Sequence, residues 1–171
     1  VGLGHRRLAI IDLSAHGNQP MSNEAGDVVI VHNGEVYNFQ QLRGELESCG
    51  HKFHSQTDTE VILHAYEQWG NECVQRFNGM FAFAIYDRRP SAEGGKLFLA
   101  RDRYGIKPLY YRTGAPGLLF ASEIKGLLEY PGVSAQICWK ALSEYFTFQN
   151  IFSDATLFDG VQLLPPGCIL S

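Results

Sequence analysis

The pattern of apolar and polar positions predicts mainly strands at the start of the chain. Leu8 to Leu13 is a largely apolar run and predicts a buried strand. Val28 to Val31 is a run of four β-branched residues and predicts a second one. Asn33-Gly34 then lies between two apolar runs, which is a strong signal for the turn of a β-hairpin. We therefore expect the chain to reverse at these two residues.

Helices and further strands follow. A helix is predicted over 39–49, and a second begins at the sequence TDTE, where Thr57 or Asp58 can be the N-cap and Glu60 completes a capping box with Thr57. The remaining predicted elements are a short helix over 71–77, strands over 81–86, 96–101, 109–112 and 118–122, helices over 123–129 and 138–148, and an extended segment over 158–171. Because helices and antiparallel hairpins come in separate blocks, the pattern indicates an α+β fold with helices outside the sheets.

Composition excludes several classes of function. The 171 residues carry a net charge of −4, so no basic excess is available to neutralise nucleic-acid phosphates. No apolar run approaches the length of a membrane span. The four cysteines, at 49, 73, 138 and 168, form no CxxC pair, which argues against a zinc ribbon or a redox motif and suits a reducing cytoplasm.

Two weaker motifs are set aside. Gly2-x-Gly4 invites a dinucleotide-binding interpretation, but Arg7 stands at the third glycine position and no strand precedes the motif. Cys49, His51 and His54 are spaced like metal ligands, but in a strand the two histidines point to opposite faces. We therefore expect no metal and no cofactor in this domain.

Several polar residues at the ends of predicted elements suggest chemistry. Asn33 and Gly34 offer a side-chain amide and a backbone N–H approachable for lack of a Cβ, the two convergent donors that an oxyanion hole needs. Arg7 is a partner for a carboxylate, and Asp58 can hold an ammonium group. Together they suit an α-amino acid with a reactive side-chain carbonyl.

Each of these residues also has a simpler interpretation. Asn33-Gly34 can be only a turn, Arg7 only a surface charge and Asp58 only a helix cap. The segment 101–103, Arg-Asp-Arg, can be an ion pair within a turn. The residues alone leave both sets of interpretations open.

The successive motifs of the chain resemble one family. In order they are GHRRLAIIDLS, HNGEVYN, TDTEVIL, NGMFAFAIYD, RDRYGIKPLYY, ASEIKGLL and LPPG. This series is similar to the glutaminase domain of glutamine-hydrolysing asparagine synthetases, a class II glutamine amidotransferase domain of the N-terminal-nucleophile hydrolase type. The resemblance covers nearly the whole chain, 1–171, as a single domain.

The resemblance implies a fold, an activity and partners. The fold is a four-layer αββα sandwich of two antiparallel sheets flanked by helices. The activity is hydrolysis of L-glutamine to glutamate, with the ammonia passing to a synthetase domain of the same chain that uses ATP and Mg²⁺ to amidate aspartate. It further implies an enzyme in the cytoplasm, with no membrane or nucleic-acid partner, and a homodimer remains open.

The resemblance also implies a role for each candidate residue. Arg7 would bind the α-carboxylate of glutamine, and Asp58 would hold its α-ammonium group. Asn33, through its side chain, and Gly34, through its N–H, would form the oxyanion hole, and Glu35 would lie in the same pocket. These roles agree with those suggested by residue chemistry.

One departure from the family pattern is important. The family nucleophile is a cysteine at the mature N-terminus whose own α-amino group is the base, whereas this sequence begins with Val1. We therefore expect an internal fragment that lacks the first strands, the nucleophile and the synthetase domain. Such a fragment would be inactive alone and would expose an unpaired sheet edge.

Two alternatives remain. The first is a non-catalytic scaffold, against which the presence of all four residues Arg7, Asn33, Gly34 and Asp58 argues. The second is an amidotransferase with a different ammonia acceptor, such as a sugar phosphate. The motif HRRLAIIDLS favours the asparagine synthetase branch, although the acceptor depends on residues outside the sequence.

Overall fold

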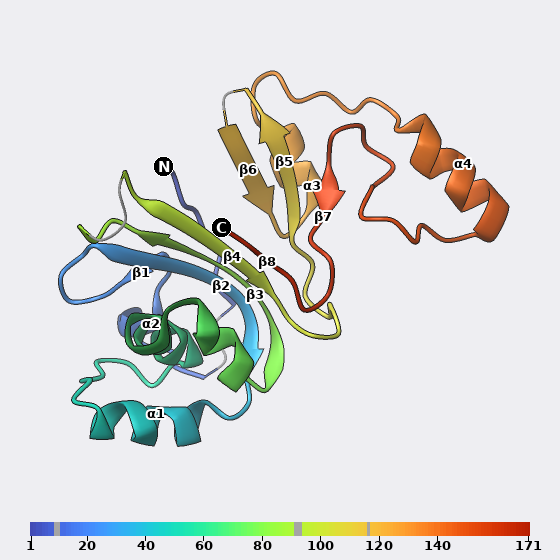
Figure 1. The fold of residues 1–171 in the computed structure, drawn as a ribbon. Coiled ribbons are helices and arrows are strands. Elements are labelled where there is room, and N and C mark those ends of the chain that lie inside the picture. The colour runs from blue at the N-terminus through green and yellow to red at the C-terminus, as the bar shows by residue number, and fades with distance from the viewer. Residues whose placement is uncertain (9–10, 91–93, 116) are drawn as a thin grey trace.

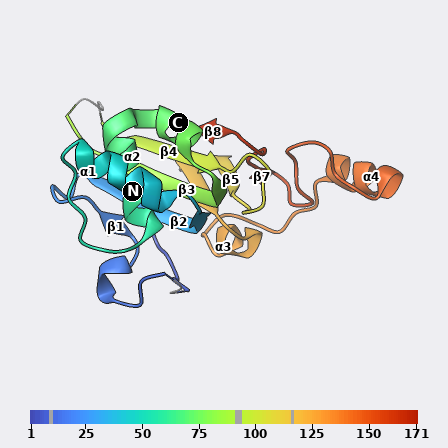
Figure 2. The same ribbon diagram turned by 90° about the horizontal axis from the view of Figure 1, so that it is seen from below.

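Two antiparallel sheets form the framework of the molecule, seen in a computed structural model that describes residues 1–8, 11–90, 94–115 and 117–171 (Figures 1 and 2). Within these ranges the larger sheet has the order β1-β2-β3-β4-β8 and the smaller one the order β6-β5-β7. The strands are β1 (Met21–Ser22), β2 (Val28–Val36), β3 (Gly79–Asp87), β4 (Lys96–Arg101), β5 (Tyr110–Gly114), β6 (Gly117–Ala121), β7 (Gln162–Leu163) and β8 (Ile169–Leu170).

Helices lie outside the sheets. They are α1 (Phe39–Ser48), α2 (Asp58–Trp69), α3 (Ile124–Leu128) and α4 (Trp139–Phe148), with the 3₁₀ segments η1 (Ala15–Gly17) and η2 (Gly70–Arg76). Figure 1 shows α1 and α2 on the face of the larger sheet that is turned away from the smaller sheet. No helix in the described ranges has the length and apolarity needed to span a bilayer.

The two faces of the larger sheet bury different clusters. One face packs on α1 and α2 through residues such as Ile30, Phe83 and Ile62, all at most 1% exposed. The opposite face packs on the smaller sheet through Val31, Ala84 and Leu109. Side chains therefore alternate between the helices and the second sheet, as the two-residue period of a strand requires.

The α+β prediction is confirmed, with helices, two antiparallel sheets and most element boundaries as expected. Helix α3 contacts the smaller sheet, whereas α4 lies away from both sheets in the two views (Figures 1 and 2). A full outer layer of helices over the smaller sheet stays a prediction.

The hairpin predicted at Asn33-Gly34 is wrong. Strand β2 runs without reversal through both residues, and its whole length pairs with β3, from Val28 opposite Asp87 to Val36 opposite Gly79. The local turn signal is overridden because a partner strand about 50 residues further along the chain offers pairing for all nine positions.

The strand predicted over Leu8 to Leu13 is wrong for its described residues. Residues 8 and 11–13 are not in a strand, and Leu8 and Leu13 are 82% and 80% exposed. Residues 9 and 10 lie outside the described ranges. The apolar run is therefore not part of the core at its two ends.

The capping of α2 is half confirmed. The Thr57 hydroxyl accepts a hydrogen bond from the N–H of Glu60 at 3.3 Å, which makes Thr57 the N-cap. The Glu60 carboxylate does not return to Thr57. It accepts instead from the N–H groups of His54 and Ser55, at 2.8 and 2.7 Å, and so orders the segment before the helix.

The segment Arg101–Arg103 spans the end of β4 and the beginning of the turn after it, and Arg101 and Asp102 organise this turn through the backbone rather than as an ion pair. The Arg101 guanidinium donates to the carbonyls of Lys107, Gly105 and Leu164, at 2.6 to 2.8 Å. The fully buried Asp102 carboxylate accepts from four backbone N–H groups, those of Phe81, Tyr104, Ile106 and Lys107. These hydrogen bonds hold the pKa of Asp102 below its usual value, although burial opposes them.

Replacing Gly34 by alanine should destabilise the fold by more than about 1 kcal/mol. Gly34 has φ +139°, and an added Cβ would meet the backbone of Met80 and Phe81. Gly44→Ala is the matched control, because that exposed glycine in α1 has open space around it and should gain about 0.5–1 kcal/mol. Urea unfolding of both variants measures the difference, and equal stability would contradict the close approach of β3.

Asp102→Asn should cost about 1.5–3 kcal/mol at pH 7, because the carboxylate accepts four N–H groups and an amide cannot. Because the pKa of Asp102 is lower in the folded state, its carboxylate stabilises the protein at pH values above the unfolded pKa of about 3.9. This stabilisation is lost as the pH falls and the carboxylate becomes protonated. The gap between parent and variant should therefore shrink below about pH 4. Urea unfolding from pH 7 to pH 3 tests this, with the exposed Asp159→Asn as control, and a constant gap would refute it.

Candidate functional site

The candidate residues, which come from three separate segments, line one pocket. It has a volume of about 230 Å³. Its lining includes all five residues singled out from the sequence, namely Arg7, Asn33, Gly34, Glu35 and Asp58. The N-terminal segment, the second half of β2, the start of α2 and the turn after β4 therefore meet at this point.

The phase of the β2–β3 ladder determines where each backbone group of β2 points. The N–H of Arg88 donates to the carbonyl of Asp27, and the N–H of Tyr37 donates to the carbonyl of Asn78, both at 2.7 Å. The odd-numbered residues of β2 therefore form the hydrogen-bonded pairs with β3. In an antiparallel pair the residues between them turn their backbone groups away from the partner.

The backbone N–H and C=O groups of the even-numbered residues point to the other edge of β2, which lies next to the pocket. The N–H of His32 donates to the side chain of Gln19 at 2.6 Å, and the N–H of Val36 donates to the carboxylate of Asp58 at 2.8 Å. Gly34 lies between them in the same phase and lines the pocket. Its N–H therefore points from the open edge of the strand towards the pocket.

Glycine is required at position 34 because of β3, and not because a substrate approaches it, as the sequence suggested. The space for its missing Cβ is taken by the backbone of Met80 and Phe81 on β3, not by open pocket. Glycine is needed there because of this contact and the positive φ. The donor expected at this residue is available even though the turn expected to present it does not exist.

The side chain of Asn33 lies on the face that packs on the smaller sheet. Its amide nitrogen donates to the hydroxyl of Ser122 at 3.3 Å, and the residue is half-buried. Asn33 lines the main pocket and also a second pocket of about 180 Å³ between the sheets. Because an amide nitrogen carries two hydrogens, one remains available while the other faces Ser122.

Asp58 is a buried carboxylate at the beginning of α2. It is 5% exposed and accepts the hydrogen bond from Val36 that ties the helix to β2. Burial raises its pKa, and the hydrogen bond from Val36 partly offsets this effect. Since Thr57 is the N-cap, the interpretation of Asp58 as only a cap is wrong. A cation beside this carboxylate would favour its ionised form.

Arg7 reaches the pocket, but its guanidinium also has contacts within its own segment. It donates to the carbonyl of Ser14 at 3.2 Å and to the carbonyl of Asp12. Glu35 is half-buried in the pocket lining. Arg7 therefore lines the pocket, while part of the hydrogen-bonding capacity of its guanidinium is used by the loop after it.

His32 is a pocket residue that the sequence analysis did not single out. Its Nδ1 lies 3.1 Å from the hydroxyl of Thr59, whereas its Nε2 is buried without a hydrogen-bond partner in the described part of the chain. Burial, followed by the charges of His5 and Lys107, lowers its pKa to about 3, so the ring is neutral at physiological pH. Continuing the strand pattern through residue 32 would have placed it beside Gly34.

The pocket thus combines features that suit a small zwitterion with a polar side chain. Its lining includes the carboxyl group of Asp58 and the guanidinium of Arg7. The N–H of Gly34 at the open edge of β2 and the side-chain amide of Asn33 are donors in the same lining. Two donors of this kind can stabilise a developing oxyanion if both reach the same atom.

Comparison with known proteins identifies a family for the chain. The model of the family described as "Glutamine amidotransferase domain" matches residues 1–171. Asparagine synthetase [glutamine-hydrolyzing] 3 of Bacillus subtilis (strain 168) is 41% identical over 171 residues, which cover 98% of this chain and 27% of that protein. Asparagine synthetase [glutamine-hydrolyzing] 2 of the same organism is 46% identical over 145 residues, covering 84% and 18% of the two chains.

A solved structure agrees at the level of the fold. The glutamine phosphoribosylpyrophosphate amidotransferase from B. subtilis, complexed with ADP and GMP, superposes with a TM-score of 0.59 at 26% identity, over 72% of this chain and 28% of that one. The present chain spans about a quarter of the length of the proteins it matches. By family match and by identity over nearly its whole length, the chain belongs to the class II glutamine amidotransferase domain family.

Proposed function

We propose that the pocket binds L-glutamine and that the chain is the glutaminase part of a glutamine-hydrolysing asparagine synthetase. The reaction is hydrolysis of the side-chain amide to glutamate and ammonia. The observation that carries the proposal is the meeting of Arg7, Asn33, Gly34 and Asp58 at one pocket, with the N–H of Gly34 on the open edge of β2. The family membership supports the same substrate.

The two ends of the amino acid match the two charged residues. Asp58 would hold the α-ammonium group, and the ion pair would offset the burial that raises the pKa of this carboxyl. Arg7 would bind the α-carboxylate with the N–H groups that its contacts to the carbonyls of Asp12 and Ser14 leave available. Glu35 would complete the polar lining of the pocket.

Asn33 and Gly34 would stabilise the tetrahedral intermediate. Its oxyanion would accept the N–H of Gly34 and the second amide hydrogen of Asn33, the first being directed at Ser122. Neither donor has to be created when the reaction occurs, since the strand already holds both. This arrangement would lower the barrier to attack on the amide carbon.

The nucleophile would be the N-terminal cysteine of the family, which is not among these residues. All four cysteines of the chain lie outside the pocket lining. Burial raises the pKa of the Cys73 thiol to about 12, which makes it a poor nucleophile. The α-amino group of the upstream cysteine would act as base, because its pKa lies near neutrality.

The ammonia acceptor would be set by a synthetase domain in the part of the protein beyond these residues. Asparagine synthetase 3 of Bacillus subtilis is about four times as long as the segment matched in it. Such a domain would use ATP and Mg²⁺ to activate aspartate, and the glutaminase domain itself would need no cofactor. We place the enzyme in the cytoplasm, where ATP is available, and leave monomer or homodimer to measurement.

A second candidate is an amidotransferase with another acceptor. The structural match to a phosphoribosylpyrophosphate amidotransferase favours it, because that enzyme carries a similar fold. The glutamine pocket would be the same in both cases, since the acceptor binds to a different domain. Assaying asparagine formation from aspartate and ATP distinguishes the two candidates.

Asn33→Ala in the complete enzyme should lower the turnover of glutamine hydrolysis about 10²- to 10³-fold, because one oxyanion donor is lost. Glutamine binding should change much less, since the interaction forms mainly in the transition state. Ammonia release at saturating glutamine measures the effect. The control is Asn150→Ala, an exposed asparagine outside the pocket lining. Unchanged turnover in Asn33→Ala would remove Asn33 from the site.

Asp58→Asn should raise the KM for glutamine about 10- to 100-fold, because a charged hydrogen bond to the α-ammonium group is worth about 1.5–3 kcal/mol. The asparagine carbonyl can still accept the N–H of Val36, so the tie between α2 and β2 remains. The exposed Asp159→Asn controls for the loss of one negative charge. A KM equal to that of the parent would show that Asp58 does not bind the substrate.

A further inference from the structure

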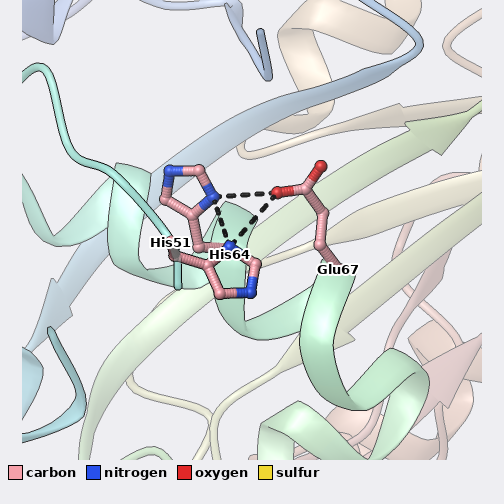
Figure 3. A group of neighbouring side chains, drawn as sticks. All are labelled: His51, His64 and Glu67. Atoms are coloured by element: carbon pink, nitrogen blue, oxygen red, sulfur yellow. Dashed lines mark hydrogen bonds and ion pairs between the residues drawn. The ribbon is translucent and has the colours of Figure 1, made fainter. Parts of the chain in front are cut away.

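Two histidines and a glutamate come together away from the glutamine pocket (Figure 3). His51 lies in the link after α1, whereas His64 and Glu67 lie on α2, three residues apart and therefore on the same face of the helix. Their side chains are 18%, 3% and 17% exposed, respectively. None of the three lines the 230 Å³ pocket.

The three inward-facing atoms have the spacing of metal ligands. His51 Nδ1 lies 3.2 Å from His64 Nδ1, which lies 2.8 Å from Glu67 Oε2, and the third side of the triangle measures 4.0 Å. A circle through three points with these separations has a radius of about 2.0 Å. Zn–N and Zn–O bonds in proteins are about 2.0–2.2 Å long, but an ion at this centre would have His51 Nδ1 and Glu67 Oε2 almost opposite each other. Tetrahedral ligands at this bond length are about 3.3–3.4 Å apart, so binding would move His64 Nδ1 and Glu67 Oε2 apart and bring His51 Nδ1 and Glu67 Oε2 closer together.

The outer nitrogens of both rings face acceptors. His51 Nε2 lies 3.1 Å from the side-chain oxygen of Gln68, and His64 Nε2 lies 3.9 Å from carboxylate oxygens of Glu24 and Glu60. The Gln68 oxygen favours a proton on Nε2 of His51, which leaves its Nδ1 with a lone pair, and an outer partner of this kind is typical of metal-bound histidines. The carboxylates beside His64 Nε2 lie beyond hydrogen-bond distance and favour a proton there by their charge alone.

The carboxylate is also oriented from outside. Glu67 Oε1 accepts a hydrogen bond from the amide of Asn23 at 2.7 Å, which leaves Oε2 facing the two rings. Burial lowers the pKa of His64, but the hydrogen bond to Glu67 and the charges of Glu67, Glu24 and Glu60 outweigh it and raise the pKa. Without an ion, a proton therefore lies between His64 Nδ1 and Glu67 Oε2, which are 2.8 Å apart. A metal ion would take the place of this proton, and each of the three inward-facing atoms would become a ligand.

We propose that His51, His64 and Glu67 bind one divalent transition-metal ion, with Zn²⁺ as the best match, and that water supplies a fourth ligand. Two imidazoles and one carboxylate are a ligand set that suits Zn²⁺. The site is structural. It fixes the link after α1 to the middle of α2, the helix whose first residue, Asp58, lines the glutamine pocket.

The site differs from the one considered from the sequence. Of Cys49, His51 and His54, only His51 belongs to this cluster. Its partners come from α2, 13 and 16 positions further along the chain. Sequence spacing alone does not reveal this grouping, because it depends on how the link packs against the helix.

Titration of the purified, tag-free protein with Zn²⁺, after treatment with a chelator, tests the proposal. One Zn²⁺ should bind per chain and raise the melting temperature. Co²⁺ in its place should give the intense visible absorption of a tetrahedral site with nitrogen and oxygen ligands. These two measurements need no variant and are independent of glutaminase activity.

Variants then locate the ion. His51→Asn and Glu67→Gln change partly exposed side chains and should each weaken Zn²⁺ binding by more than about tenfold, since even loss of an outer partner typically costs about 10- to 100-fold. His54→Asn is the matched control, because this nearby exposed histidine is not in the cluster. Circular dichroism confirms that each variant is folded.

Three results would overturn the proposal. The first is the absence of Zn²⁺ binding by the parent at micromolar concentrations. The second is binding that neither His51→Asn nor Glu67→Gln weakens, and the third is an equal loss in His54→Asn. In the first case the three side chains form only a hydrogen-bonded network, with a proton at the place assigned to the metal.

Discussion

The site depends on the unbroken pairing of β2 with β3. Nine residue pairs, from Val28 opposite Asp87 to Val36 opposite Gly79, hold the two strands in one register. Because side chains and backbone groups alternate with a period of two, a shift by one residue would turn the N–H of Gly34 into the ladder. The same shift would move the side chain of Asn33 to the helical face. The chemistry of the pocket therefore requires this register.

The second requirement is the position of α2 against the open edge of β2. Thr57 caps the helix, and the carboxylate of Asp58 accepts the N–H of Val36, so the helix begins where the strand ends its pairing. One residue thus joins two elements and also places a buried carboxylate in the pocket. Burial alone makes this charge unfavourable, whereas a bound cation makes it favourable. A buried carboxylate whose charge is stabilised only when a cation binds beside it fits a site for an ammonium group.

Elements whose determining interactions are local could be predicted from the sequence. The strand Lys96–Arg101 follows from a pattern within a few residues and was located correctly, and the N-cap at Thr57 is one of the two residues that the local pattern offered. The hairpin at Asn33-Gly34 was predicted wrongly, because the local signal for a turn competes with a partner strand that is distant in sequence.

The five candidate residues do line one pocket, but their geometry did not follow from the sequence. Residue type and family resemblance identified Asn33 and Asp58, whereas the contact of Asn33 with Ser122 depends on the packing of the two sheets. His32 was missed because it was assigned to a turn and not to the strand edge. The contacts of Arg7 with carbonyls of its own segment depend on the path of a loop, which no periodic pattern describes.

The conformation of Gly34 has a consequence for genetics. Two unrelated demands meet at this position, a backbone shape that L-residues with side chains rarely adopt and an N–H directed at the pocket. A loss of activity after substitution here would not reveal which demand was violated. Asn33, one position earlier, has an ordinary backbone and tolerates a smaller side chain sterically, so its phenotype is the easier one to interpret. Substitutions at two adjacent positions would thus report on different properties, those at Gly34 on the fold as well as the site and those at Asn33 on the reaction chemistry.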